Sequence, residues 1–232
     1  MLAYAEVPIG GRPAACARCR PCPEEAPFIP AEEVASAIRR DVQARGGSVA
    51  LVGGDAFEHP AWRDLVSGAL VAGARRLRTD AGPALAVYAE EALCVGVRHV
   101  RVRLLAPPSR HDELLRAAGA GEATLAGVRA FLDAAERAGV SAVVTAILPV
   151  CRHNLHDLPA TVTALAETGA ASAEAVLDTA SVPPGPAAPW LAAAADSGTV
   201  NRMWLRLAGV TEGALPGYEM HFEPPFATGE PA

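Results

Sequence analysis

The sequence predicts an α/β fold in which helices connect the strands of a parallel sheet. Segments with apolar residues every three or four positions alternate with short apolar runs that are typical of buried strands. In the first part of the chain these runs recur about 25 residues apart, which leaves room for one crossover helix between them. About five or six such units fit either an open sheet or a partial barrel, and in both the functional residues lie on loops after the carboxyl ends of the strands.

The length, charge and composition of the chain exclude several classes of protein. The chain has 232 residues, which suits one large α/β domain or two small ones. Its formal net charge is −6, and no run of Lys or Arg forms a basic tail, so nothing indicates nucleic-acid binding. No window approaches the roughly 20 continuous apolar residues of a membrane span, and the first residues lack the pattern of a signal peptide. We therefore expect a cytoplasmic protein whose cysteines are reduced thiols or metal ligands.

The first βα elements are read from apolar periodicity. A helix is expected at 31–45, because Val34, Ile38 and Val42 recur on one face. The run SVALVGG at 48–54 follows and ends in glycines, which is typical of a buried strand.

The same alternation continues to about residue 180. Further helices are expected at 62–72, 83–93, 122–138 and 155–167, and further strands at 75–79, 99–105, 141–150 and 174–180. The Pro-rich stretch at 181–189 predicts a break. We therefore divide the chain into a barrel-like domain at 1–180 and a short, irregular C-terminal extension at 181–232, with a short helix at 190–195 and a possible strand at 202–209.

Three of the five cysteines form a CxxCxxC cluster of Cys16, Cys19 and Cys22. This spacing is too tight for a disulfide framework and favours a metal or cluster site. Three thiolates can hold three irons of a four-iron cluster and leave one iron open to a ligand, whereas structural zinc normally takes four ligands. A chance cluster of surface thiols is the alternative. Of the isolated cysteines, Cys94 is interpreted as a small buried hydrophobe, and Cys151 follows a strand.

A glycine loop ends the strand at 48–54. Gly53 and Gly54 are followed by Asp55, and glycines at such a place let a ligand approach the backbone closely. The loop lacks the Lys-Ser/Thr ending of a phosphate-binding loop, and a tight βα turn is the structural alternative. His59, before a proline, is interpreted as a turn residue rather than a ligand.

Polar residues also follow the later strands. The segment LRTDAG at 77–82 ends one strand in polar residues and glycine. After the next strand, His111 and Asp112 are either acid–base groups or, as we favour, the solvated start of a helix. Arg152 and Asn154 stand at the end of a further strand, just before a helix.

Taken in order, these segments resemble the radical S-adenosylmethionine (radical SAM) superfamily over about residues 3–180. The cysteine triplet is followed by GGD in place of the superfamily's GGE, by TDAG at 79–82 in place of TNG, by HDELLR at 111–116 and by RHNLHDLP at 152–159. The superfamily spacing is CxxxCxxC, so the CxxCxxC of this chain marks a divergent member.

The resemblance implies a partial (β/α)6 TIM-like barrel, with Cys16, Cys19 and Cys22 holding a [4Fe–4S] cluster. It further implies that the open iron binds SAM and that an electron donor protein drives the reductive cleavage of SAM. The 5′-deoxyadenosyl radical that results abstracts hydrogen from a substrate that the sequence does not identify.

The resemblance also assigns residues to SAM. Gly53, Gly54 and Asp55 meet its methionine end, and Thr79 and Arg103 lie nearer its ribose or carboxylate. The short segment after the barrel suits a peptide or macromolecular substrate, or a partner chain that closes the barrel. Two alternatives stay open: a non-catalytic relative that binds a partner, and a barrel enzyme whose three cysteines hold a zinc ion that activates water.

Overall fold

The computed structural model describes residues 4–11, 27–45, 47–210 and 212–222. In this part of the chain one sheet of seven strands is formed, in the order β1 to β7, and every neighbouring pair is parallel. The strands are β1 (Ala5–Gly10), β2 (Ser48–Gly53), β3 (Arg76–Ala81), β4 (His99–Arg103), β5 (Val143–Val150), β6 (Ser172–Leu177) and β7 (Trp204–Ala208). The α-helices are α1 (Ala31–Arg45), α2 (Trp62–Val71), α3 (Leu85–Cys94), α4 (Pro108–Leu115), α5 (Ala120–Ala138), α6 (Leu158–Ala166) and α7 (Pro184–Val200).

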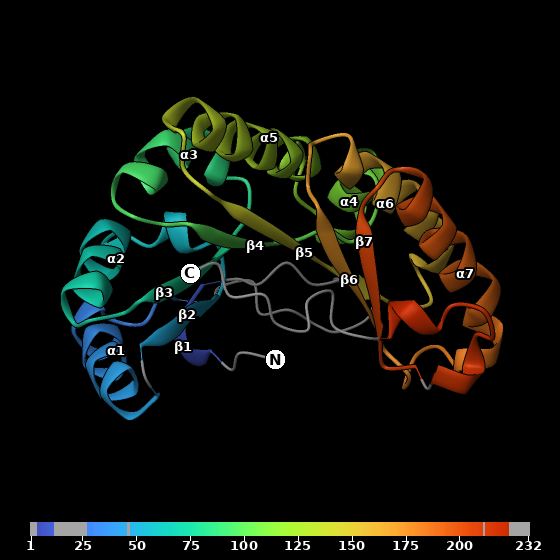
Figure 1. Cartoon of the computed structure of the whole chain (residues 1–232), viewed down its shortest axis with the longest axis horizontal. Coiled ribbons are helices and arrows are strands. Elements are labelled where there is room, and N and C mark those ends of the chain that lie inside the picture. The colour runs from blue at the N-terminus through green and yellow to red at the C-terminus, as the bar shows by residue number, and fades with distance from the viewer. Residues whose placement is uncertain (1–3, 12–26, 46, 211, 223–232) are drawn as a thin grey trace.

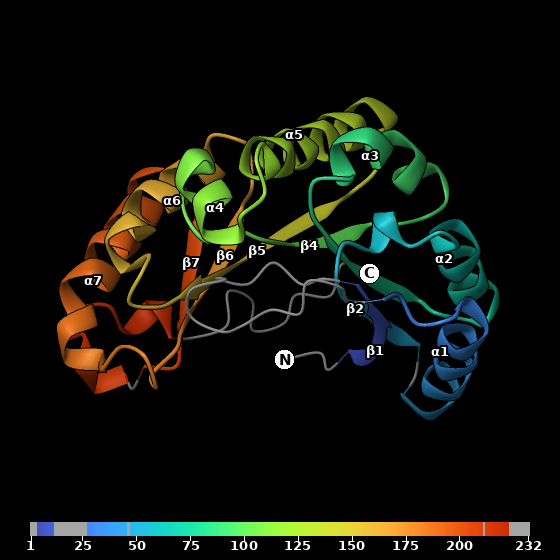
Figure 2. The same cartoon turned by 180° about the vertical axis from the view of Figure 1, so that it is seen from behind.

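The sheet curves into an open arc, and the helices cover its convex side (Figures 1 and 2). No pairing joins β1 to β7 among the described residues, so the barrel is partial. The predicted α/β fold with a parallel, TIM-like sheet is therefore confirmed, although we expected six strands and the sheet has seven.

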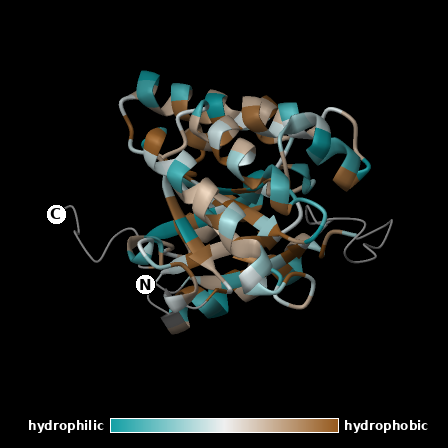
Figure 3. Cartoon of the chain, turned by 90° about the vertical axis from the view of Figure 1, so that its right-hand side faces the viewer, coloured by the Kyte–Doolittle hydropathy of each residue, from teal (hydrophilic) through white to brown (hydrophobic). Residues whose placement is uncertain are grey.

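Alternation along the strands separates a core face from a concave face. In β4, Val100 and Val102 are fully buried against the helices, while His99, Arg101 and Arg103 are half-buried on the other side. In Figure 3 the strands carry much of the brown, and teal residues recur along the helices. The polar concave face is the surface that a ligand reaches without disturbing the core.

The segment after residue 180 differs from the expected irregular extension. Its prolines begin a helix: Pro183 is the N-cap of α7 and Pro184 occupies the first helical position, where a missing N–H costs nothing. The helix is longer than the expected 190–195 and includes Pro189. β7, predicted as a possible strand, pairs with β6 and extends the sheet beyond the boundary that we placed after residue 180.

No helix among the described residues is long and apolar enough to cross a membrane.

Candidate functional site

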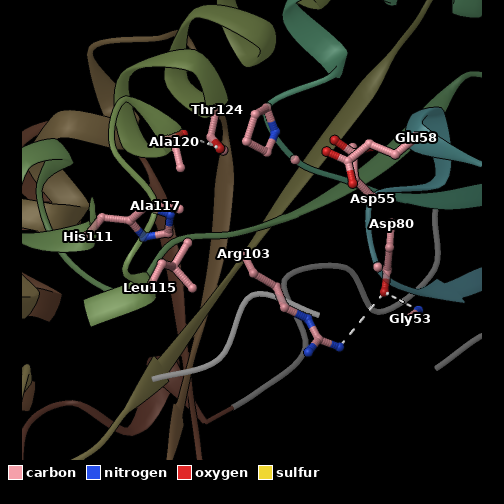
Figure 4. Close-up of a pocket in the computed structure, with 14 residues that line it drawn as sticks. Gly53, Asp55, Glu58, Asp80, Arg103, His111, Leu115, Ala117, Ala120 and Thr124 are labelled. Atoms are coloured by element: carbon pink, nitrogen blue, oxygen red, sulfur yellow. Dashed lines mark hydrogen bonds and ion pairs between the residues drawn. The ribbon is translucent and has the colours of Figure 1, made fainter. Parts of the chain in front are cut away.

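A pocket of about 170 Å³ lies at the carboxyl ends of β2, β3 and β4. Its lining residues are Gly53, Gly54, Asp55, Glu58, Asp80, Ala81, Gly82, Pro83, Arg103, His111, Leu115, Ala117, Ala120 and Thr124. In Figure 4 three carboxylates occupy one side, His111 and small apolar residues occupy the other, and Arg103 reaches in between them. Four of the five residues predicted to contact SAM line this pocket, and Thr79 does not.

The glycine loop after β2 depends on having no side chain at Gly53. Gly53 has a φ of 137°, and a Cβ there would lie 2.6 Å from the carbonyl oxygen of Gly10. Its N–H donates to Asp80 Oδ2 at 3.1 Å, and the Gly54 N–H donates to the Gly10 carbonyl at 2.8 Å. Since both N–H groups are used, the loop has oxygen acceptors rather than donors to offer a ligand.

Asp55 holds two loops together. Its Oδ1 accepts the Phe57 N–H at 3.1 Å, and its Oδ2 accepts the Ala84 N–H at 2.8 Å, just before α3. Burial raises the pKa of this carboxyl from 3.8 to about 6. Asp55 therefore shapes the wall of the pocket and stays largely ionised at neutral pH.

Asp80 is the central acid of the site, and sequence reasoning did not single it out. Besides the Gly53 N–H, it accepts two hydrogen bonds from Arg101, at 2.5 and 2.9 Å. The adjacent Thr79 is fully buried, because neighbouring residues of a strand point to opposite faces. The alternation of buried and exposed positions along β3 could have shown from the sequence that Asp80, rather than Thr79, faces the pocket.

Arg103 supplies positive charge to the pocket. Its Nη2 lies 3.8 Å from Asp80 Oδ2, and its side chain is 31% exposed. Its Nε is buried and has no acceptor among the described residues. The guanidinium therefore has donors left for an anionic group.

His111 is not the solvated helix residue that we favoured from the sequence. It is 1% exposed in α4, a helix that begins directly after Pro107. Its Nδ1 accepts the Leu105 N–H at 3.0 Å, so the proton of the neutral ring is on Nε2. Burial lowers the pKa of His111 from 6.5 to about 4, which keeps the ring neutral at physiological pH.

Asp112 and Asn154 organise the surrounding loops. Asp112 accepts the N–H groups of Gly119 and Gly121, at 2.5 and 2.8 Å, and so joins α4 to the start of α5. Asn154 donates to the carbonyls of Leu105 and Pro149, at 2.6 and 2.7 Å, which links the loops after β4 and β5. Both residues therefore hold in place the loops that surround the pocket.

The remaining cysteine and histidine predictions have mixed outcomes. Cys94 is exposed, so its interpretation as a buried residue was wrong, whereas Cys151 is buried after β5. His59 donates from Nε2 to the Ile29 carbonyl at 3.0 Å and accepts the Ala61 N–H at Nδ1, also at 3.0 Å, which confirms its predicted place in a turn. Arg152 is exposed, beside His153.

Cys16, Cys19 and Cys22 lie outside the described residues. The two ends of their segment are described, however, and meet at the carboxyl end of β1. The Gly11 N–H donates to the Pro27 carbonyl at 3.2 Å, and Gly10 also accepts the Gly54 N–H. The chain thus leaves and re-enters the fold beside the glycine loop of the pocket. Among the described residues no group of three His, Cys, Asp or Glu is arranged to hold a metal ion.

Comparison with known proteins finds no matching family model and no matching curated protein. Solved structures do match. Streptococcus suis SuiB bound to S-adenosylmethionine is 11% identical, with a TM-score of 0.58 over 83% of this chain and 47% of that one. The FeFe-hydrogenase maturase HydG from Carboxydothermus hydrogenoformans is 11% identical, with a TM-score of 0.59 over 91% of this chain and 55% of that one. The chain thus spans about half the length of these structures.

The HMG-CoA lyase from Brucella melitensis also matches, at 16% identity and a TM-score of 0.51 over 78% of this chain and 65% of that one. Similar folds thus serve different chemistries, so the fold alone does not identify the function. The chain has the open, parallel β/α barrel that its resemblance to the radical SAM superfamily implies.

Proposed function

We propose that this protein is a radical SAM enzyme with a [4Fe–4S] cluster on Cys16, Cys19 and Cys22. The donor set fits, because three thiolates hold three irons and leave the fourth for SAM. The ends of the cysteine segment lie beside the Gly53–Gly54 loop, which is where a cluster must be to reach the pocket. When bound, the cluster supplies the electron that cleaves SAM to methionine and a 5′-deoxyadenosyl radical for hydrogen abstraction.

The charge pattern of the pocket carries the proposal. The methionine end of SAM combines an ammonium, a sulfonium and a carboxylate. Asp55, Glu58 and Asp80 form an acidic wall that suits the two cations, and Arg103, at the Asp80 end of this wall, receives the carboxylate. An acidic wall with one arginine at its end matches this group of two cations and one anion better than it matches a phosphate or a purely anionic ligand.

The predicted SAM contacts then take separate roles. The Gly53–Gly54 loop offers oxygen acceptors to the ammonium, because its two N–H groups are already donated. Asp55 fixes this loop through its own hydrogen bonds. Arg103 orients the carboxylate, whereas Thr79 is fully buried on the other face of β3 and is given no contact with SAM. None of these residues has to move a proton for the cleavage.

The other wall of the pocket suits the adenosine. Leu115, Ala117 and Ala120 offer small apolar surface, and the Nε2–H of His111 offers one donor. A histidine that stays neutral donates this hydrogen bond without adding charge near the sulfonium.

The wider assignments follow from the same proposal. An electron donor protein reduces the cluster, and the cytoplasm keeps the three thiols reduced. SuiB has also been solved bound to its precursor peptide SuiA, and that likeness to this chain supports a peptide as a candidate substrate or partner. A partner chain that closes the open barrel is the second candidate, favoured because β1 and β7 do not pair among the described residues.

A cleavage assay tests the proposal. Anaerobically reconstituted and reduced protein is expected to convert SAM to 5′-deoxyadenosine and methionine, and Arg103→Met is expected to lower SAM affinity about tenfold through the lost charge-assisted hydrogen bonds. Arg39→Met, on the outer surface of α1, serves as the matched control. SAM binding without cleavage would favour the non-catalytic relative, and no SAM binding at all would overturn the proposal.

A further inference from the structure

The concave face of the sheet carries a group of partly buried arginines. Alternation along β3, β4 and β7 places Arg78, Arg101, Arg103 and Arg206 on this face. The Nε atoms of Arg78, Arg103 and Arg206 are buried without an acceptor among the described residues. A buried donor without a partner is costly, so three on one face need an explanation.

Two of these arginines already interact with acidic or aromatic side chains of the protein. Arg101 makes two hydrogen bonds to Asp80, and its Nη1 lies 3.7 Å from Glu6. Arg78 Nη2 lies 3.5 Å from Glu6 Oε1. The guanidinium carbon of Arg78 also lies over the ring of Tyr4, 4.6 Å from the ring centroid. Both side chains are less than one-fifth exposed, so neither is free to take a ligand.

Arg206 is different. Its one acceptor among the described residues is Glu174, directly opposite on β6, which receives a single bond from Nη1 at 3.2 Å. Glu174 also lies within the electrostatic reach of Arg101, so its charge is shared between two guanidinium groups. Arg206 is 27% exposed and therefore keeps accessible donors and unbalanced positive charge.

Two apolar side chains lie on the same face, on the strands next to this cation. Ile147 is the register partner of Glu174, and Val176 is 37% exposed on β6, two residues beyond Glu174. Arg103 pairs in register with Ile147, so β4 and β7 are three strand spacings apart, or roughly 14 Å. The group of Ile147, Glu174, Val176 and Arg206, the β5–β7 patch, is thus distinct from the SAM pocket, and its strands continue the sheet whose concave side carries that pocket (Figure 1).

We infer that the β5–β7 patch binds the substrate through a carboxylate or phosphate group on Arg206, with an adjoining apolar part against Ile147 and Val176. Glu174 holds the guanidinium through Nη1, which leaves Nη2 to donate a charge-assisted hydrogen bond to the anion. Naming the ligand a substrate rests on the radical SAM function proposed above, whereas binding of the anion does not require the cluster.

Calorimetric titration with simple probes tests this inference. Hexanoate and hexyl phosphate present one apolar chain with two different anions, and hexylamine presents the same chain with a cation. We expect one or both anions to bind the wild-type protein and hexylamine not to bind. Arg206→Met should weaken the anion at least about tenfold, while Arg206→Lys should retain part of the affinity and Arg39→Met all of it. The stronger of the two anions identifies the group that the substrate carries.

The outcomes separate this inference from the proposed function. Equal binding of hexanoate, hexyl phosphate and hexylamine to the wild type, or unchanged anion affinity in Arg206→Met, would overturn it. Arg206→Met should leave substrate-free SAM cleavage within about twofold, since the patch lies outside the pocket. Anion binding that depends on Arg206 in a protein without SAM cleavage would overturn the proposed function and keep the anion site. If Arg206→Met does not fold, Arg206→Lys and the three probes on the wild type decide.

Discussion

Asp80 accepts the N–H of Gly53 at 3.1 Å and so ties the end of β3 to the glycine loop after β2. The same carboxylate holds Arg101 through two hydrogen bonds. One buried acid thus fixes both the backbone that is proposed to meet the ammonium of SAM and the neighbouring cations of the concave face.

Replacing Asp80 by a neutral residue should therefore lower the free energy of unfolding. Asp80→Asn removes the closer and more buried of the two acidic partners of Arg101, and we expect the free energy of unfolding to fall by about 3 kcal/mol. Urea denaturation of the protein measures this. Glu6→Gln is the control, because Glu6 is 58% exposed and its loss should cost less than about 1 kcal/mol. Equal effects of the two variants would contradict the central place given to Asp80.

Gly53 should not tolerate a side chain. In Gly53→Ala the new Cβ meets the Gly10 carbonyl at 2.6 Å, and φ is 137°, so we expect a loss of at least about 2 kcal/mol in unfolding free energy together with a loss of SAM binding. Gly185→Ala is the matched control: Gly185 lies in α7 with nothing within 4 Å of its Cβ position, and alanine there should be neutral or stabilising. A fully stable Gly53→Ala variant would refute the close contact.

His111 and Asp55 should give opposite pH dependences. The native pKa of His111 lies below its ordinary value, at about 4 rather than 6.5, so its stabilisation is present above pH 6.5 and is lost as the pH falls toward 4. The native pKa of Asp55 is raised from 3.8 to about 6, so its contribution is greatest below pH 4 and declines as the pH rises to 6. Each shift corresponds to roughly 3 kcal/mol.

Urea denaturation at several pH values separates the two groups. The difference in unfolding free energy between the wild type and His111→Gln should grow from pH 4 to 6.5. The difference between the wild type and Asp55→Asn should shrink over the same range. Parallel changes in the two variants would show that burial does not control these residues as described.

Much of the fold is readable from local pattern, and the site is readable only in part. The apolar periodicity of 31–45 and the run at 48–54 predict α1 and β2 closely, because each element is amphipathic or bounded by glycine. The glycine loop was found for the same reason. Asp80 was missed because its role depends on register with Gly53 and Arg101, which lie on other strands.

Two further errors have local physical causes. His111 was assigned to a solvated helix start because the sequence does not show that α4 turns this side chain inward to meet the Leu105 N–H. The prolines after residue 180 were interpreted as a break, although proline also favours the first turn of a helix, as in α7. The cysteine triplet remains a prediction, since it lies outside the described residues.

The most direct test of the central claim is metal analysis of anaerobically reconstituted protein, with Cys19→Ala and Cys94→Ala beside the wild type. We predict about four iron and four sulfide per chain in the wild type and in Cys94→Ala, whose exposed thiol lies outside the triplet, and a loss of most of both in Cys19→Ala. One zinc per chain, or no metal in the wild type, would contradict the account.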